Sequence, residues 1–138
     1  MAAAIQSPGA AGGGVLVVKV DGAATTDAAG LGSILNPEGV PLLILRATWY
    51  VLVESAGAAN IGIGITTAAA KSTTILNDLD ANAVEGDVFN GHAMQNTAKT
   101  EITAPAIWTA TTYLTFSGHA TSVGMEAYLL LEYVRLPE

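Results

Sequence analysis

The stretch from Leu42 to Glu54 is the feature that most constrains the fold of this chain. Its sequence, LLILRATWYVLVE, is apolar, aromatic and β-branched, with no Gly or Pro inside it, which is typical of a long β-strand. Because successive side chains of a strand point to opposite faces, the stretch divides into two sets. The wholly apolar set is predicted to lie in a core and the mixed set to be half covered. The apolar set is Leu43, Leu45, Ala47, Trp49, Val51 and Val53; the mixed set is Leu42, Ile44, Arg46, Thr48, Tyr50, Leu52 and Glu54.

The composition is poor in charge for a chain of 138 residues. Charged residues make up 12% and hydrophobic residues 51%, whereas about 25% of residues are charged in an average protein. Because monomers rarely expose large apolar patches, we expect much of the surface to be buried against other subunits. The alternative is an Ala-rich soluble monomer, since Ala is small and tolerates exposure. Cys is absent, so the fold must stand without disulfides.

The charge balance bears on the partners of the chain. The net charge is -7 and only five residues are Lys or Arg, too few for a surface that binds phosphates, so we expect no nucleic-acid partner. No apolar run reaches the roughly 18 residues of a membrane helix, and the first residues lack the regions of a secretory signal. The sequence therefore predicts a soluble protein without a membrane partner, made and assembled in the cytoplasm.

Further runs with strand character follow at short spacing, separated by Gly and Asx turn signals, and no amphipathic helix stands out. We predict an all-β antiparallel β-sandwich of about eight strands, of the jelly-roll type, over residues 15–138. A flexible Ala- and Gly-rich arm is predicted over residues 1–14. Residues 23–41 are predicted to be a long loop that crosses between the sheets, with room for one short turn of helix. The other strands are expected at residues 15–20, 60–66, 72–76, 100–103, 106–109, 112–117 and 125–135, with Gly118 beginning a turn.

Gly62 and Gly64 alternate with three isoleucines in the stretch NIGIGIT at residues 60–66. The Ile face is predicted to be core. Gly on the other face of a strand marks either the close approach of another backbone or a ligand, or a bulge or bend, and the sequence leaves both open. Together with the mixed faces of the two long strands, these positions are the candidates for an interface. The candidates are Tyr50, Leu52, Gly62, Gly64, Tyr128 and Leu130.

Residues 78–87 contain the one candidate metal site. They begin like a helical calcium loop, but Ala83 stands at the sixth position instead of Gly and Phe89 at the twelfth instead of Glu, which excludes that loop. Calcium takes six to eight oxygen ligands, so a solvated acidic loop is the favoured interpretation and we expect no bound metal. A looser calcium site remains the alternative, with ligands from Asp78, Asp80, Asn82 and Asp87.

No pattern in the sequence identifies a catalytic site, so we expect that the protein is not an enzyme and has no cofactor. His92 and His119 are the two histidines; we place them in separate surface loops, and they lack the spacing of a zinc site. Ser117 lies close to His119 in the sequence, but the G-x-S-x-G motif of a serine hydrolase is missing.

Four parts of the chain share their character with one family: the Ala- and Gly-rich arm and the stretches NIGIGI at residues 60–65, TYLT at residues 112–115 and AYLLLEYVR at residues 127–135. Together they resemble the small jelly-roll structural proteins of tailed bacteriophages that are called decoration or cement proteins. The resemblance implies a virion structural protein on the capsid surface that stabilises the head against the pressure of its DNA. Such proteins usually sit as homotrimers over local symmetry axes, so the implied partners are copies of the chain and the major capsid protein.

An alternative function is a sugar- or receptor-binding β-sandwich module of a phage tail or fibre. Such a module would need exposed aromatic side chains beside Asp and Asn. Aromatic residues on half-buried strands more often fill a core or an interface, and Trp108 is predicted to cap one end of the core. The candidates for a sugar-stacking platform are Trp108, Tyr113 and Tyr128.

Overall fold

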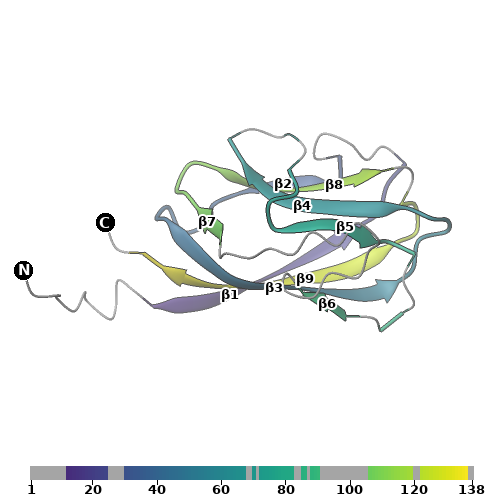
Figure 1. The fold of residues 1–138 in the computed structure, drawn as a ribbon, viewed down its shortest axis with the longest axis horizontal. Coiled ribbons are helices and arrows are strands. Elements are labelled where there is room, and N and C mark those ends of the chain that lie inside the picture. Colours follow the sequence, from purple (N-terminus) through teal and green to yellow (C-terminus); the bar gives the residue numbers. More distant parts are fainter. Residues whose placement is uncertain are drawn as a thin grey trace, which may run out of the picture.

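The regular elements of the computed structural model are all strands, in the ranges that the structure describes: residues 12–24, 30–67, 70, 72–82, 85–86, 88–90, 106–119 and 122–136 (Figure 1). The predicted all-β class is therefore confirmed. The strands are β1 (Gly13–Asp21), β2 (Gly32–Leu35), β3 (Leu42–Val53), β4 (Asn60–Thr66), β5 (Leu76–Asp80), β6 (Val88–Asn90), β7 (Ala106–Trp108), β8 (Tyr113–His119) and β9 (Glu126–Arg135).

The strands form two antiparallel sheets that face each other (Figure 1). The five-stranded sheet has the order β1-β9-β3-β6, with β7 also paired to β3, and the four-stranded sheet has the order β2-β8-β4-β5. β6 pairs with residues 48–50 of β3 and β7 with residues 42–44, so these two short strands share one position beside β3. When β6 and β7 are counted as one strand, the two sheets have the strand order of an eight-stranded jelly roll, as the sequence predicts.

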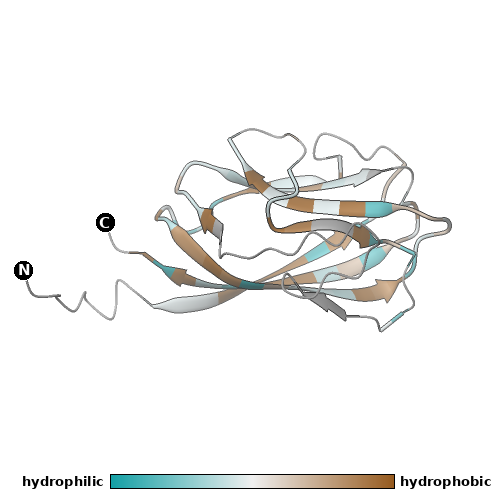
Figure 2. Cartoon of the chain, viewed as in Figure 1, coloured by the Kyte–Doolittle hydropathy of each residue, from teal (hydrophilic) through white to brown (hydrophobic). Residues whose placement is uncertain are grey.

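The core lies between the two sheets, and Figure 2 shows hydrophobic residues on strands of both layers. Trp49 and Trp108 are its largest fully buried side chains, which confirms the predicted places of both. Trp108 closes one end of the core, and its Nε1 donates a hydrogen bond to the carbonyl of Thr112 (2.9 Å). Strict alternation along β9 gives this strand one inner face, with Ala127, Leu129, Leu131 and Tyr133 buried.

β3 contains a β-bulge that changes which of its residues face the core. Its pairing with β9 shifts register between Ile44 and Arg46, so Leu45 is an extra residue and the alternation changes face there. Leu42 and Ile44 are consequently buried, although we predict them on the half-covered face, and Leu45 is 45% exposed.

A second register shift in β3 lies between Val51 and Val53. Leu52, between them, is half-buried, and Val53 is 42% exposed. The prediction that Leu43, Leu45 and Val53 belong to the core is therefore wrong, because two bulges interrupt the alternation on which it rests. The same prediction is confirmed for Ala47, Trp49 and Val51.

Some predicted boundaries also change. β2 lies inside the predicted loop of residues 23–41, and the predicted crossing from one sheet to the other is wrong: the segment reaches the four-stranded sheet at β2 and returns, so that β1 and β3 lie in the same sheet. The edge strand predicted at residues 72–76 begins only at Leu76, and β8 continues through Gly118 to His119, so Gly118 starts no turn and His119 ends a strand. The strand expected at residues 100–103 lies outside the described residues.

The predicted arm of residues 1–14 extends too far, because β1 already begins at Gly13. Gly14 has a packing role there: a Cβ on it would lie 2.7 Å from the Tyr133 hydroxyl and 2.8 Å from the ring carbon beside it. The lack of a side chain at Gly14 makes room for the Tyr133 ring of β9. Residues 1–11 of the predicted arm lie outside the described residues.

Asn36 organises the turn between β2 and β3. Its buried side chain donates hydrogen bonds to the carbonyls of Val40 and Trp108 (2.9 Å each), and its Oδ1 accepts from the backbone N–H groups of Glu38 and Gly39 (2.9 and 3.1 Å). Asn before Pro is a turn signal. Here the same residue also ties the turn to the end of β7.

Candidate functional site

The outer face of the five-stranded sheet carries most of the candidate interface residues. Directly opposite residues of an antiparallel pair have their side chains on the same face, so the register of β1, β9 and β3 sets the side chains in rows across the sheet. One row joins Lys19, Tyr128 and Tyr50, and the next joins Val17, Leu130 and Thr48. Two further rows are Val15, Glu132 and Arg46, and then Gly13, Val134, Leu43 and Ile107.

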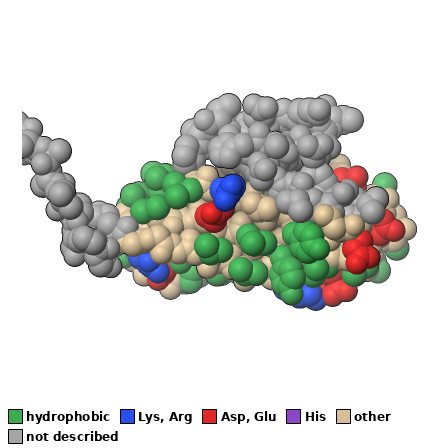
Figure 3. Space-filling model, turned by 90° about the horizontal axis from the view of Figure 1, so that it is seen from below, with side chains coloured by type: hydrophobic (Ala, Val, Ile, Leu, Met, Phe, Trp, Pro, Cys, Tyr) green, Lys and Arg blue, Asp and Glu red, His purple; other side chains and the backbone are tan. Residues whose placement is uncertain are grey.

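Apolar and aromatic side chains of this face are open to solvent. Val15 is 59% exposed, Val17 57% and Ile107 51%, while Tyr50 is 37% exposed beside the half-buried Tyr128. Seen from below, hydrophobic side chains are spread across this face, with only a few charges among them (Figure 3). The structure thus brings together the interface candidates Tyr50, Tyr128 and Leu130, and it places Leu52 near them in the second bulge of β3.

The charges on this face are paired with each other. Lys19 Nζ lies 2.6 Å from Glu126 Oε1 and 3.0 Å from Asp21 Oδ1, and these hydrogen bonds raise the pKa of Lys19. Arg46 pairs with Glu132 directly across the strands, which raises the pKa of Arg46 and lowers that of Glu132. Exposed pairs contribute little stability, but pairing leaves this face with less free charge than its residue types suggest.

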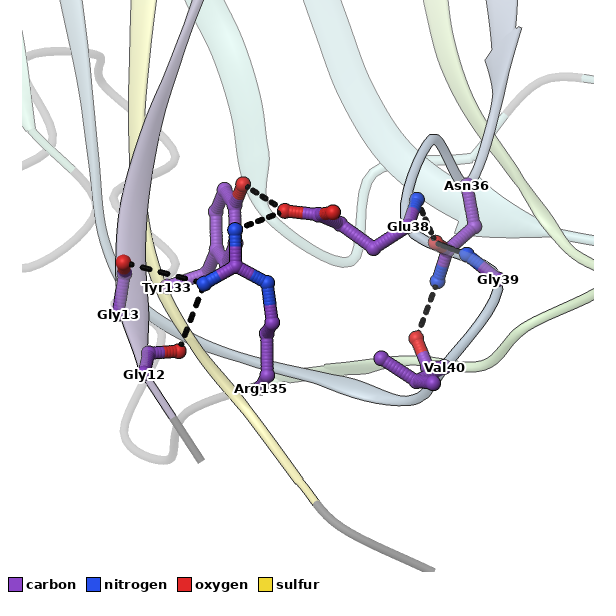
Figure 4. A network of polar contacts seen from close by, with 8 residues as sticks. All are labelled: Gly12, Gly13, Asn36, Glu38, Gly39, Val40, Tyr133 and Arg135. Atoms are coloured by element: carbon purple, nitrogen blue, oxygen red, sulfur yellow. Dashed lines mark hydrogen bonds and ion pairs between the residues drawn. The ribbon is translucent and has the colours of Figure 1, made fainter. Parts of the chain in front are cut away.

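A network of polar contacts at one end of the sandwich joins three segments of the chain (Figure 4). The Tyr133 hydroxyl donates to Glu38 Oε2 (2.7 Å), and Arg135 Nη2 pairs with the same oxygen. Arg135 Nη1 also donates to the carbonyls of Gly12 and Gly13 (3.1 and 3.3 Å). The Tyr133 hydrogen bond and then the Arg135 contact lower the pKa of Glu38, and the bond to Glu38 raises the pKa of Tyr133.

Gly62 and Gly64, the other interface candidates, are buried by the chain itself. A Cβ on Gly62 would lie 2.9 Å from Thr73 Cγ2, and one on Gly64 would lie 2.2 Å from Ser72 Oγ and 2.6 Å from the Ser72 carbonyl carbon. Of the two alternatives that the sequence leaves open, a close approach occurs at both glycines, and the pairing of β4 with β5 also shifts register between Ile61 and Ile63. The approaching segment belongs to the same chain, so these two residues do not lie on an accessible surface.

The structure describes two of the four calcium candidates in full: Asp80 ends β5 and Asn82 lies in the turn that follows. Asp80 Oδ1 accepts the N–H of Asn82 (2.9 Å), and Asn82 Nδ2 donates to the Ser55 carbonyl (2.6 Å). The side chain of Asp78 and the whole of Asp87 lie outside the described residues. Among the described residues, no group of three or more His, Asp or Glu side chains is arranged to hold a metal ion.

The three aromatic candidates for a sugar platform are separated. Trp108 is fully buried, Tyr128 lies on the outer face of the five-stranded sheet, and Tyr113 belongs to β8 in the other sheet. They form no common surface. His92 and the side chain of His119 lie outside the described residues.

The contribution of β1 to the candidate site was missed by sequence reasoning. Val15 and Val17 are more exposed than Tyr50, but their place beside Tyr128 and Leu130 depends on the pairing of β1 with β9, which are far apart in the sequence. The alternation of Val17 with Leu16 and Val18 was the available signal: it predicts two apolar faces, and one sandwich can bury only one of them.

No protein-family model, no curated protein and no solved structure matches the chain. In the part of the chain that the structure describes, no helix is long and apolar enough to cross a membrane.

Proposed function

We propose that this chain is a virion structural protein that binds the outer surface of an icosahedral phage head as a decoration or cement protein and stabilises the capsid. The observation that carries the proposal is the outer face of the five-stranded sheet, where Tyr50, Tyr128 and Leu130 lie together with few unpaired charges. Aromatic residues are enriched and free charges depleted at the centres of protein interfaces.

The fold and the resemblance supply the rest of the proposal. Jelly rolls occur in viral capsid proteins, and also in lectins and cupins, so the fold alone does not select a function. The resemblance to decoration proteins favours the capsid surface, with the major capsid protein and copies of the chain, arranged as trimers, as partners. The sugar-binding alternative has less support, since the candidate aromatic residues do not share a surface.

The experiment mixes the purified protein with empty heads of the phage whose genome carries the gene and measures co-sedimentation and head melting. Wild-type protein should bind at a fixed ratio and raise the melting temperature of the heads. The double variant Tyr50→Ser with Tyr128→Ser should lose at least ten-fold in affinity, because it removes two aromatic anchors.

Leu35→Ser is the matched control, since Leu35 is 50% exposed but belongs to the other sheet. It should bind heads like the wild type, and all proteins should have the same far-ultraviolet circular dichroism. Wild-type protein that stays in the supernatant at micromolar concentration would refute head binding. Equal losses in the double variant and the control would refute the assignment to this face.

A further inference from the structure

β1 presents the longest sheet edge among the described strands. It ends the five-stranded sheet and has nine residues, whereas the other strands at sheet edges, β2, β5, β6 and β7, have three to five. An edge strand exposes a row of unpaired N–H and C=O groups to which another strand can pair. A long edge therefore needs either a partner or a feature that blocks pairing.

The hydrogen bonds to β9 show which backbone groups of β1 face this edge. The N–H of Arg135 donates to the Gly12 carbonyl (3.0 Å) and the N–H of Gly22 donates to the Met125 carbonyl (2.8 Å), and the register between them is unbroken. Bonded and non-bonded pairs alternate in an antiparallel ladder, so the even-numbered residues bond to β9. The odd-numbered residues turn their N–H and C=O groups to the free edge: Gly13, Val15, Val17, Lys19 and Asp21.

The usual features that block pairing are weak along this edge. Edges are commonly protected by Pro, by bulges or by charged side chains, especially Lys. β1 has no Pro and no register shift, and its one cation, Lys19, is already paired with Glu126 and Asp21. From Gly13 to Val18 the strand carries no charge, while Val15 and Val17 are both more than half exposed.

We propose that β1 pairs antiparallel with β1 of a second copy of this chain, about a two-fold axis at Val17, so that two five-stranded sheets become one. In this register Val17 lies opposite itself, Val15 opposite Lys19, and Gly13 opposite Asp21. The pairs formed by Val15, Val17 and Lys19 exchange both of their N–H···O bonds, because these residues have the parity that faces the edge. The Gly13 carbonyl already accepts from Arg135 Nη1 (3.3 Å), so the pair at the end of the strand is the weakest.

The sequence of β1 favours this register over its neighbours. Every other register leaves some of the backbone N–H and C=O groups that face the edge unpaired at the ends of β1. Centring the axis on Lys19 also sets two like charges opposite each other, which is destabilising, whereas the axis at Val17 opposes no like charges. The contact is isologous, with the same surface used twice, which is the commonest symmetry of soluble oligomers. It needs no part of the head-binding proposal and is a contact separate from the trimer that the resemblance implies.

The first test uses single cysteines, for which the chain is well suited because it contains none. A bonded antiparallel pair has its Cα atoms about 5.5 Å apart, within disulfide range, so Val17→Cys should give a covalent dimer on mild oxidation. Val15→Cys alone should not, since the two copies of residue 15 are offset by about 13 Å along the strands. A mixture of Val15→Cys and Lys19→Cys should cross-link.

The second test exploits the self-opposition of residue 17. Val17→Lys and Val17→Glu each place like charges on the axis, so each variant should have half the molar mass of wild type by light scattering. An equimolar mixture should regain the wild-type mass, because Lys then faces Glu. Circular dichroism should match the wild type, since the Val17 side chain is 57% exposed.

Four results would overturn the proposal. The first is the absence of a Val17→Cys dimer at concentrations at which wild type self-associates. The second is equal mass for wild type and both charge variants. The third is a monomer whose Val17→Cys thiol is shielded from a maleimide, because another part of the same chain would then cover the edge. Cross-linking to a different protein in place of a second copy would also refute it.

Discussion

Gly64 illustrates how a residue without a side chain fixes the path of a distant segment. The backbone and side chain of Ser72 fill the space in which a Cβ on Gly64 would lie. Ser72 Oγ donates to the Ile65 carbonyl (3.2 Å), and the Ile65 N–H donates to Thr74 Oγ1 (2.9 Å). The segment before β5 is thereby held flat against β4.

Gly64→Ala should therefore destabilise the protein by about 1 to 3 kcal/mol, the usual cost of overpacking a closely packed site. The added methyl group would lie 2.6 Å from a backbone carbon of Ser72, which cannot move without breaking the contacts around it. Chemical denaturation measures the change. Gly57→Ala is the control, because nothing lies within 4 Å of its Cβ position, and it should be neutral or slightly stabilising. Equal stability of the two variants would contradict the packing described for Gly64.

The sequence predicts part of this arrangement and not the rest. Alternation of Ile with Gly indicates a strand, a core face and a close approach on the other face. It does not identify Ser72 as the approaching residue, because that depends on how the connection between β4 and β5 folds back. The same limit applies to Gly14, whose neighbour Tyr133 is more than a hundred residues away in the sequence.

At the scale of the element, β3 shows where strand periodicity fails. Both of its alternating sets begin with apolar residues, so the sequence cannot show that the bulge at Leu45 moves Leu42 and Ile44 to the core. β2 escapes prediction for another reason: GSIL is too short to show a period, and it begins with Gly32, two residues after Gly30. Its pairing with β8 makes it a strand.

The bulge makes a direct prediction for neighbouring residues of β3. Ile44→Ala should cost about 2 to 5 kcal/mol, because Ile44 is 4% exposed and its loss leaves a cavity. Leu45→Ala should change stability by less than about 0.5 kcal/mol, as expected for a surface position. Urea unfolding of both variants measures the difference. If Leu45→Ala proved the more damaging change, the alternation would be unbroken and the bulge absent.

The Glu38 network links the β2–β3 turn to β9 and to the start of β1, and it should make stability depend on pH. The folded protein holds the pKa of Glu38 below its ordinary value of 4.5, so this contribution is complete above that pH and is lost as pH falls through the lowered pKa. Glu38→Gln should lower the melting temperature at pH 7, and the difference from wild type should shrink toward pH 3.

The control for this prediction is Glu132→Gln, which breaks the more exposed pair with Arg46. Exposed pairs contribute less, so its melting temperature at pH 7 should fall less than that of Glu38→Gln. A Glu38→Gln deficit that stayed constant from pH 7 to pH 3 would show that the lost contact does not depend on the charge of Glu38.

At the scale of the whole molecule, the candidate site is a product of topology more than of motifs. Strand alternation predicts that Tyr50 and Tyr128 lie on outward faces, but only the sheet order places them opposite each other and adds β1 beside them. The proposed head-binding face and the proposed β1 edge adjoin, because Val15 and Val17 belong to both. Pairing two copies at β1 would extend the apolar face across both copies. Self-association and binding to the phage head would then use one continuous surface.

The position of β9 determines when the five-stranded sheet can form during synthesis of the chain. A ribosome synthesises β9 after every other described strand, yet in the finished sheet β9 lies between β1 and β3. Until it emerges, β1 and β3 have no common neighbour, and their valine and leucine side chains remain open to chaperones and to other nascent chains. The pairing of β1 with β9 joins the two most distant parts of the described sequence. Contacts between distant parts of a chain make folding slow, and this one can form only late. A chain stopped short of β9 would leave β1 without a partner strand and β3 paired only with the short strands β6 and β7.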